Sequence, residues 1–151
     1  MSKVTDIKNY LDTLVNTALP SAYLELPDNL ATQDNANTFL EKGFAISYGP
    51  SENDTQNFCQ GELLVTRQYD IRLTNTYVPN NDESYRGGLE SALMEDMHLV
   101  LISLQSDILL GGNAFDSIPD GDTGIQYLIE EDEEQIITTA LSLRVRYRET
   151  F

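Results

Sequence analysis

The sequence has little of several residue types that carry chemistry. It contains one cysteine, Cys59, one histidine, His98, and no tryptophan among 151 residues. A single cysteine excludes an internal disulfide and suits a reducing compartment. No stretch approaches the ~20 apolar residues of a membrane-spanning helix, and the first 14 residues lack the apolar run and cleavage site of a signal peptide. The sequence therefore predicts neither a membrane segment nor a secretory leader.

Basic residues are also scarce. Nine Lys and Arg residues stand against 25 Asp and Glu residues, which gives a formal net charge of −16. Residues 1–134 hold 24 of the acidic residues and only six of the basic ones, whereas the last 17 residues hold three arginines and one glutamate. Duplex binding depends on Lys and Arg displacing counterions, so we expect no sequence-specific DNA binding. An acidic surface would instead let DNA slide past without sticking.

No catalytic constellation is recognisable. His98 has no Ser or Cys paired to it by motif, and Cys59 has no His or Cys at metal-ligand spacing. Asp116, Asp120 and Asp122 could meet a hard cation, but their spacing is not that of an EF-hand and favours a solvated turn. The sequence predicts no enzyme, no cofactor and no metal site, and a divalent-cation-dependent binding module stays open as the less favoured alternative.

Two stretches have the 3.6-residue periodicity of amphipathic helices. The first spans residues 2–18, with Ser2 or Thr5 as a candidate cap and Pro20 beyond its end. The second spans residues 84–106, with Ser84 as a candidate cap. Because Gly87 and Gly88 weaken its first turn, a start near residue 89 is an alternative.

Other stretches alternate with the period of two that is typical of strands. Residues 42–49 and 62–78 predict an antiparallel hairpin around a turn-rich loop at 50–61. A strand as long as 62–78 would extend roughly 50 Å, so we expect a bend, a bulge or an extension beyond the core. Residues 125–130 predict another strand.

The connecting segments are rich in polar residues and turn formers. Residues 21–40 predict a long connection. Residues 113–124 predict a turn-rich segment with a possible short strand at 114–118, and residues 131–134 predict a charged hairpin tip.

Residues 135–148 predict a long last strand with two very different faces. One of its faces is almost wholly apolar, and the other changes from small neutral residues to Arg144, Arg146 and Arg148. With Arg67 and Arg72, these arginines make up more than half of the basic residues. Arginine favours bidentate pairing with carboxylates, so the strand end is either a solvated face paired within the chain or a contact with an acidic face of an identical neighbour or another partner. The second alternative makes these five arginines candidate interface residues.

The order of elements defines the fold class. It is α-β-β-α-β-β, with one further β if the short strand forms, over a single domain of residues 1–151. The simplest packing is an α+β fold in which a mostly antiparallel β-sheet with long strands is flanked by two α-helices.

This layout resembles the tail terminator, or tail completion, proteins of long-tailed bacteriophages with non-contractile tails. The resemblance lies in the short N-terminal helix, the segments GFAISYG, ELLVTRQYDIRLTNTY and LESALMEDMHLVLISL, and the closing segment LSLRVRYRETF. It implies a non-enzymatic virion protein, made in the host cytoplasm and placed at the head–tail junction, that needs no cofactor.

The resemblance also implies partners. It implies a ring of identical subunits, expected to be a hexamer, that caps the head-proximal end of the tail tube, stops tube polymerisation and meets a neck or head-completion protein. DNA would pass through the lumen without specific binding. A neighbouring neck or head-completion protein of the same assembly is the alternative.

Overall fold

A computed structural model gives the fold, and it describes residues 2–20, 23–25, 42–59, 62–77, 83–129 and 135–150. The elements follow the predicted order, with one short strand added near the start. They are α1 (Lys3–Ala18), β1 (Leu24–Glu25), β2 (Lys42–Cys59), β3 (Glu62–Tyr77), α2 (Glu83–Ser106), the 3₁₀ turn η3 (Leu110–Gly112), β4 (Asp116–Asp122), β5 (Gln126–Ile129) and β6 (Gln135–Thr150). The predicted α+β class is confirmed.

Among the described strands, β6 has the most pairing partners, namely β3, β4 and β5. The strand order is β1-β2-β3-β6-β4, and β5 pairs with β6 on the same side as β4. β3 pairs with β6 from Glu62 opposite Thr150 to Tyr77 opposite Gln135, so the two strands are aligned along their whole length. Every pairing is antiparallel except that of the two-residue β1 with β2.

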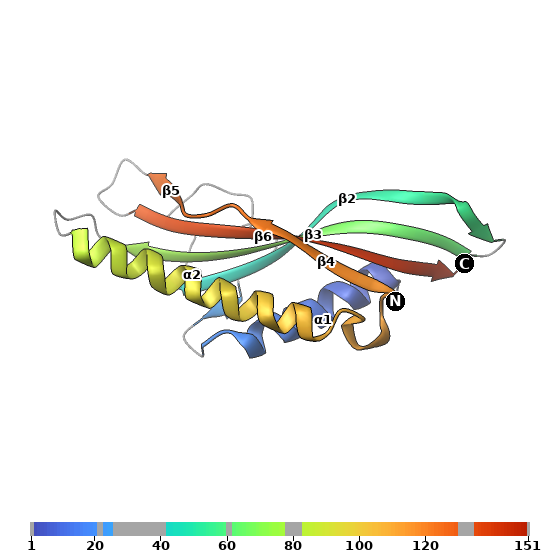
Figure 1. Ribbon diagram of the computed structural model, residues 1–151, viewed down its shortest axis with the longest axis horizontal. Coiled ribbons are helices and arrows are strands. Elements are labelled where there is room, and N and C mark those ends of the chain that lie inside the picture. The colour runs from blue at the N-terminus through green and yellow to red at the C-terminus, as the bar shows by residue number, and fades with distance from the viewer. Residues whose placement is uncertain are drawn as a thin grey trace.

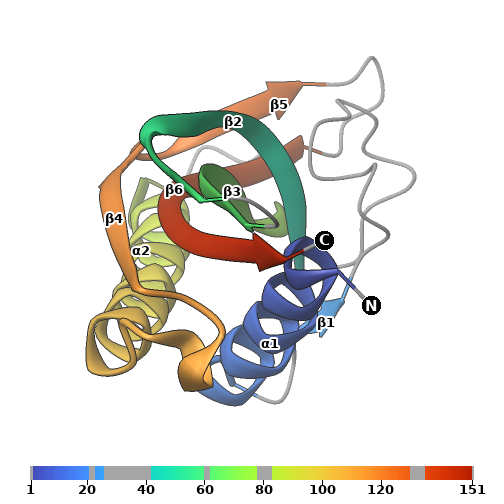
Figure 2. The same cartoon turned by 90° about the vertical axis from the view of Figure 1, so that its right-hand side faces the viewer.

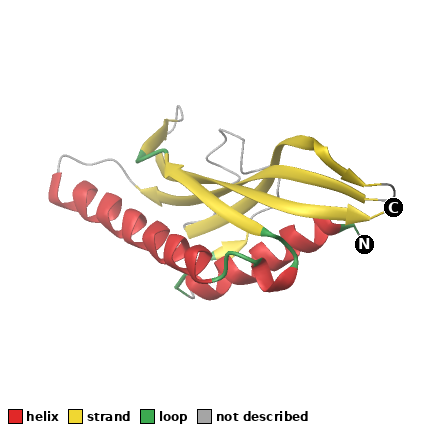
Figure 3. Ribbon diagram, turned by 45° about the vertical axis from the view of Figure 1, so that its right-hand side comes forward, coloured by secondary structure: helices red, strands yellow, loops and turns green. Residues whose placement is uncertain are grey.

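Both helices lie on one side of this elongated sheet (Figure 1). Seen along the long axis, α1 and α2 sit side by side beneath the curled strands (Figure 2). The N-terminus of α1 and the C-terminus of β6 come together at one end of the molecule (Figure 3). The backbone N–H of Lys3 donates to both carboxylate oxygens of Glu149, at 3.2 and 3.0 Å. Glu149 therefore caps α1, whereas the predicted cap Ser2 makes no side-chain cap hydrogen bond.

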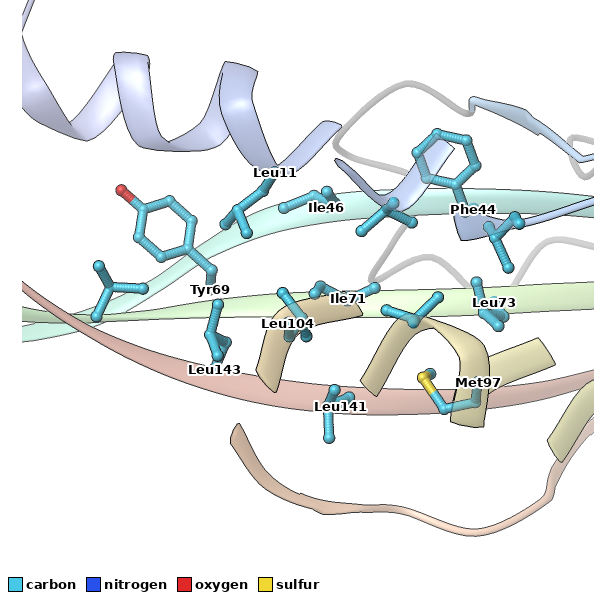
Figure 4. Close-up of a cluster of buried hydrophobic side chains, with 14 of the residues drawn as sticks. Leu11, Phe44, Ile46, Tyr69, Ile71, Leu73, Met97, Leu104, Leu141 and Leu143 are labelled. Atoms are coloured by element: carbon cyan, nitrogen blue, oxygen red, sulfur yellow. The ribbon is translucent and has the colours of Figure 1, made fainter. Parts of the chain in front are cut away.

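The core fills the space between the helices and the sheet. Alternate residues of β6 point into it, including Leu141 and Leu143, and they meet Tyr69 and Ile71 of β3 and Leu104 of α2 (Figure 4). Removing these apolar side chains from water is the main force that holds helices and sheet together. The predicted apolar face of the last strand is confirmed.

Residues 50–59 differ from the prediction. They were expected to form a loop, but β2 continues through them to Cys59 and pairs with β3. The register shifts between Tyr48 and Ser51 and again between Asp54 and Cys59. The extra residues lie on β2, whereas β3, the strand for which a bend, a bulge or an extension was predicted, pairs with β6 without a register shift. Ladder hydrogen bonds to β3 outweigh the turn preference of residues 50–59.

Three further expectations need correction. Residues 116–122 form strand β4 on β6 and not a solvated turn, although the predicted short strand at 114–118 anticipated part of it. The stretch 21–40 contributes β1. α2 begins at Glu83, so a start near residue 89 and a cap at Ser84 are both wrong. The predicted tip at 131–134 lies outside the described residues.

Candidate interaction surface

The three arginines at the end of β6 alternate with buried residues. Arg144, Arg146 and Arg148 are exposed on the helix-free face, whereas Val145 and Tyr147 between them are buried. The period of two thus separates a basic face from a core face within one strand.

Two of these arginines pair with β4. Arg146 donates from Nε to Asp116 Oδ1 at 2.9 Å and also forms an ion pair with Asp116 through Nη2. Arg144 Nη2 lies 3.3 Å from Asp120 Oδ1. The hydrogen bond from Arg146 lowers the pKa of Asp116 below its ordinary value. Pairing within the chain, one of the two alternatives, is therefore what the structure contains at both positions.

Apolar side chains lie among these charges. The guanidinium of Arg148 stands over the ring of Phe115, 4.9 Å from its centroid. Phe115 is 46% exposed and Ile118, opposite Arg144 in the strand pairing, is 50% exposed. We call the surface formed by Phe115, Asp116, Ile118, Asp120, Arg144 and Arg146 the β4 patch.

Arg67 and Arg72, which were also candidate interface residues, lie outside the β4 patch. Arg67 lies on the opposite face of β3, half-buried, and donates to the hydroxyl of Tyr147 at 3.3 Å and to the carbonyl oxygen of Gly49 at 3.2 Å. It thereby ties the first β2 bulge to β6. Arg72 is half-buried on the helix-free face, opposite Ala140 and Ala45. The five candidate arginines are thus divided among three places.

A polar network on the helix-free face was missed in the sequence. Gln68 Nε2 donates to Asp70 Oδ1 at 2.9 Å and to Ser142 Oγ at 3.3 Å, and Ser142 Oγ lies 2.8 Å from the same Asp70 oxygen. Asp70 and Ser142 are direct cross-strand partners. The alternation placed all three on polar faces, but only the register of β3 and β6 brings them together.

The acidic residues near β4 do not form a metal centre. Asp116 and Asp120 are paired with arginines, and the described part of the chain holds no group of three or more His, Cys, Asp or Glu residues that could bind a metal ion. His98 is exposed on α2 and borders a cleft of about 210 Å³ with Asp120 and Asp122. The cation-dependent alternative receives no support from this arrangement.

A larger groove runs between the two helices on their outer side. Its volume is about 430 Å³, and none of the described residues that line it is charged. We call it the helix groove, and it is lined by Tyr10, Thr13, Leu14, Thr17, Ala18, Ile102, Ser103 and Ser106.

The connection from α2 to β4 contacts Tyr10, one of the residues that line this groove. Leu110, Gly111 and Gly112 have φ values of 48°, 65° and 92°, a left-handed turn in which glycine is favoured. Asp107 accepts a hydrogen bond from the Gly111 N–H at 3.1 Å and another from the Tyr10 hydroxyl. The hydrogen bond to Asp107 raises the pKa of Tyr10. We call these contacts the η3 lock.

Exposed apolar side chains concentrate in the segment that runs from α2 to β4. In the described part of the chain, six of the seven large exposed hydrophobic residues fall between residues 99 and 118, and the seventh is Tyr48 on β2. The six are Leu99, Ile102, Ile108, Leu109, Phe115 and Ile118. Exposed apolar side chains that gather in one patch mark a surface for protein contact, and Phe115 and Ile118 both lie in the β4 patch.

Comparisons with known proteins find similarity in structure but not in sequence. No family model matches the chain, and no curated protein matches its sequence. Among solved structures it is similar to the sheath/tube terminator of an extracellular contractile injection system, PVC, in its extended state, with a TM-score of 0.45 and 11% identity. The alignment covers 95% of this chain and 56% of that one, so this chain spans little more than half the length of its structural neighbour. Among the described helices, none is both long and apolar enough to cross a membrane.

Proposed function

We propose that this chain is a non-enzymatic structural protein of a bacteriophage tail, located in the virion at the head–tail junction. It forms a ring, expected to be a hexamer, at the head-proximal end of the tail tube. The ring stops tube polymerisation and joins the tail to a neck or head-completion protein, and DNA passes through its lumen without specific binding. The proposal does not rest on the similarity to the injection-system terminator, although the name of that protein agrees with it.

The observation that carries the proposal is the chemistry of the exposed surface. On a chain of net charge −16, the β4 patch combines two ion-paired arginines with the exposed side chains of Phe115 and Ile118. Protein interfaces favour aromatic residues and arginine, whereas a catalytic site needs an activated nucleophile or a general acid–base pair. The patch therefore supports contact between proteins and gives no support to catalysis.

A tube-polymerisation assay tests the function. Tail tube protein from the same phage is polymerised in vitro with and without this chain, and tube length is measured by electron microscopy. The proposal predicts short tubes with a ring at one end. Tubes of unchanged length together with binding to the head connector would instead establish the neck or head-completion role.

A further inference from the structure

We propose that the β4 patch of one copy binds in the helix groove of a second copy, so that copies join head to tail. The inference rests on the self-assembly proposed above and specifies the two surfaces that would carry it.

Electrostatic repulsion restricts where two copies can meet. Each copy carries a formal charge of −16, and a charge of this size keeps copies apart over most of their surface. Among the residues that the structure describes, those lining the helix groove are all uncharged. In the β4 patch, Asp116 and Asp120 are each paired with an arginine. Both surfaces can therefore approach another copy without adding unpaired negative charge.

The two surfaces also complement each other in polarity, because both expose apolar side chains. The groove is concave, and Ile102 at its rim is 47% exposed. The β4 patch offers Phe115 and Ile118, which are 46% and 50% exposed. Burying these apolar side chains against one another would remove them from water and stabilise the contact.

The contact joins two different surfaces, which determines the symmetry of the assembly. When the same patch meets itself, the result is a closed dimer, whereas a contact between different patches continues to a third copy. Such a series closes into a ring when the rotation allows it. A head-to-tail contact is thus the kind that a ring requires.

Site-specific cross-linking tests the pairing. The only cysteine is first removed by Cys59→Ser, and Ile102→Cys and Ile118→Cys are then placed in separate chains. The two proteins are mixed over a concentration series and treated with a short bis-maleimide. Because each chain has one thiol, every cross-link joins two copies. Tyr48→Cys replaces Ile118→Cys in the control mixture, since Tyr48 is 44% exposed but lies on β2, away from the patch.

We expect cross-links between positions 102 and 118 and at least tenfold fewer between 102 and 48. Cross-links that join only 102 to 102 or 118 to 118 would show a two-fold contact and overturn the inference. A preference for 102–118 in species that never close into rings would support the contact and count against the proposed ring. Rings seen by native mass without 102–118 cross-links would support the ring and overturn the contact.

A charge placed in the groove gives a second measurement. Ile102→Asp should weaken self-association at least tenfold, because a carboxylate would be buried without a partner. Gln105→Asp adds the same charge at an exposed position of α2 that does not line the groove, and it should change self-association less than twofold. Equal effects of the two substitutions would overturn the inference.

Discussion

Replacing Gly111 by alanine should destabilise the η3 lock by two separable effects. Gly111 has φ +65°, and the left-handed conformation costs a residue with a β-carbon about 1–2 kcal/mol. The added β-carbon would also lie 2.6 Å from Cε2 of Tyr10. The ring must then move, and its hydrogen bond to Asp107 is strained or lost, which costs up to about 1.5–3 kcal/mol for a bond to a charged group.

The neighbouring glycine is a matched control. Gly112 has φ +92°, but no atom lies within 4 Å of the position of an added β-carbon. Gly112→Ala should therefore cost only the ~1–2 kcal/mol of backbone strain, whereas Gly111→Ala should cost about 3–5 kcal/mol. With about 2–4 °C per kcal/mol for a domain of this size, the melting temperature should fall roughly two to three times as far for Gly111→Ala as for Gly112→Ala.

Urea unfolding measures both variants, alone and in a Tyr10→Ala background. In that background the ring is absent, so Gly111→Ala should cost no more than Gly112→Ala. If the free energies of unfolding of the two single variants agree within about 0.5 kcal/mol, the contact with Tyr10 does not constrain the turn, and the reasoning is wrong.

Three other predictions concern charged contacts. Glu149→Ala should remove the cap of α1 at Lys3 and lower the free energy of unfolding by about 1 kcal/mol. Glu95→Ala, on the exposed side of α2, is the control. Equal decreases in the free energy of unfolding for the two variants would contradict the capping role of Glu149. Arg146 lowers the pKa of Asp116 below its ordinary value of 3.8, so the ion pair should be fully present above pH 3.8 and be lost as the pH falls through the lower pKa of the folded state. Carboxyl NMR titration should show a higher pKa for Asp116 in Arg146→Gln. An unchanged pKa would refute the role of Arg146 in lowering it. Arg144→Glu combined with Arg146→Glu should prevent ring assembly while the monomer stays folded, as measured by circular dichroism. Intact rings of this double variant would contradict the prediction.

Much of the fold could be read from periodicity. The alternation in residues 135–148 predicted which side chains of β6 enter the core, and the apolar stripe of residues 84–106 predicted α2. Both signals depend on one face of an element being buried, which is a local property of the sequence. The helix ends were harder to place, because the cap of α1 comes from Glu149, 146 residues away along the chain.

What the sequence did not reveal depends on contacts between distant strands. Residues 116–122 are rich in turn formers, and only the hydrogen bonds to β6 make them a strand. The pairing of Arg146 with Asp116 follows from the register of β4 on β6. The sequence could therefore identify the arginines as candidate residues but could not predict which carboxylates they pair with. The helix groove arises from the packing of α1 against α2, and no single segment encodes it.

The most direct test of the proposed ring is the native mass of the purified protein over a concentration series, with negative-stain images of any large species, alone and with tail tube ends as a template. We expect closed rings of about six subunits, formed alone or on the tube end. A strict monomer that neither assembles on tube ends nor limits their growth would contradict it.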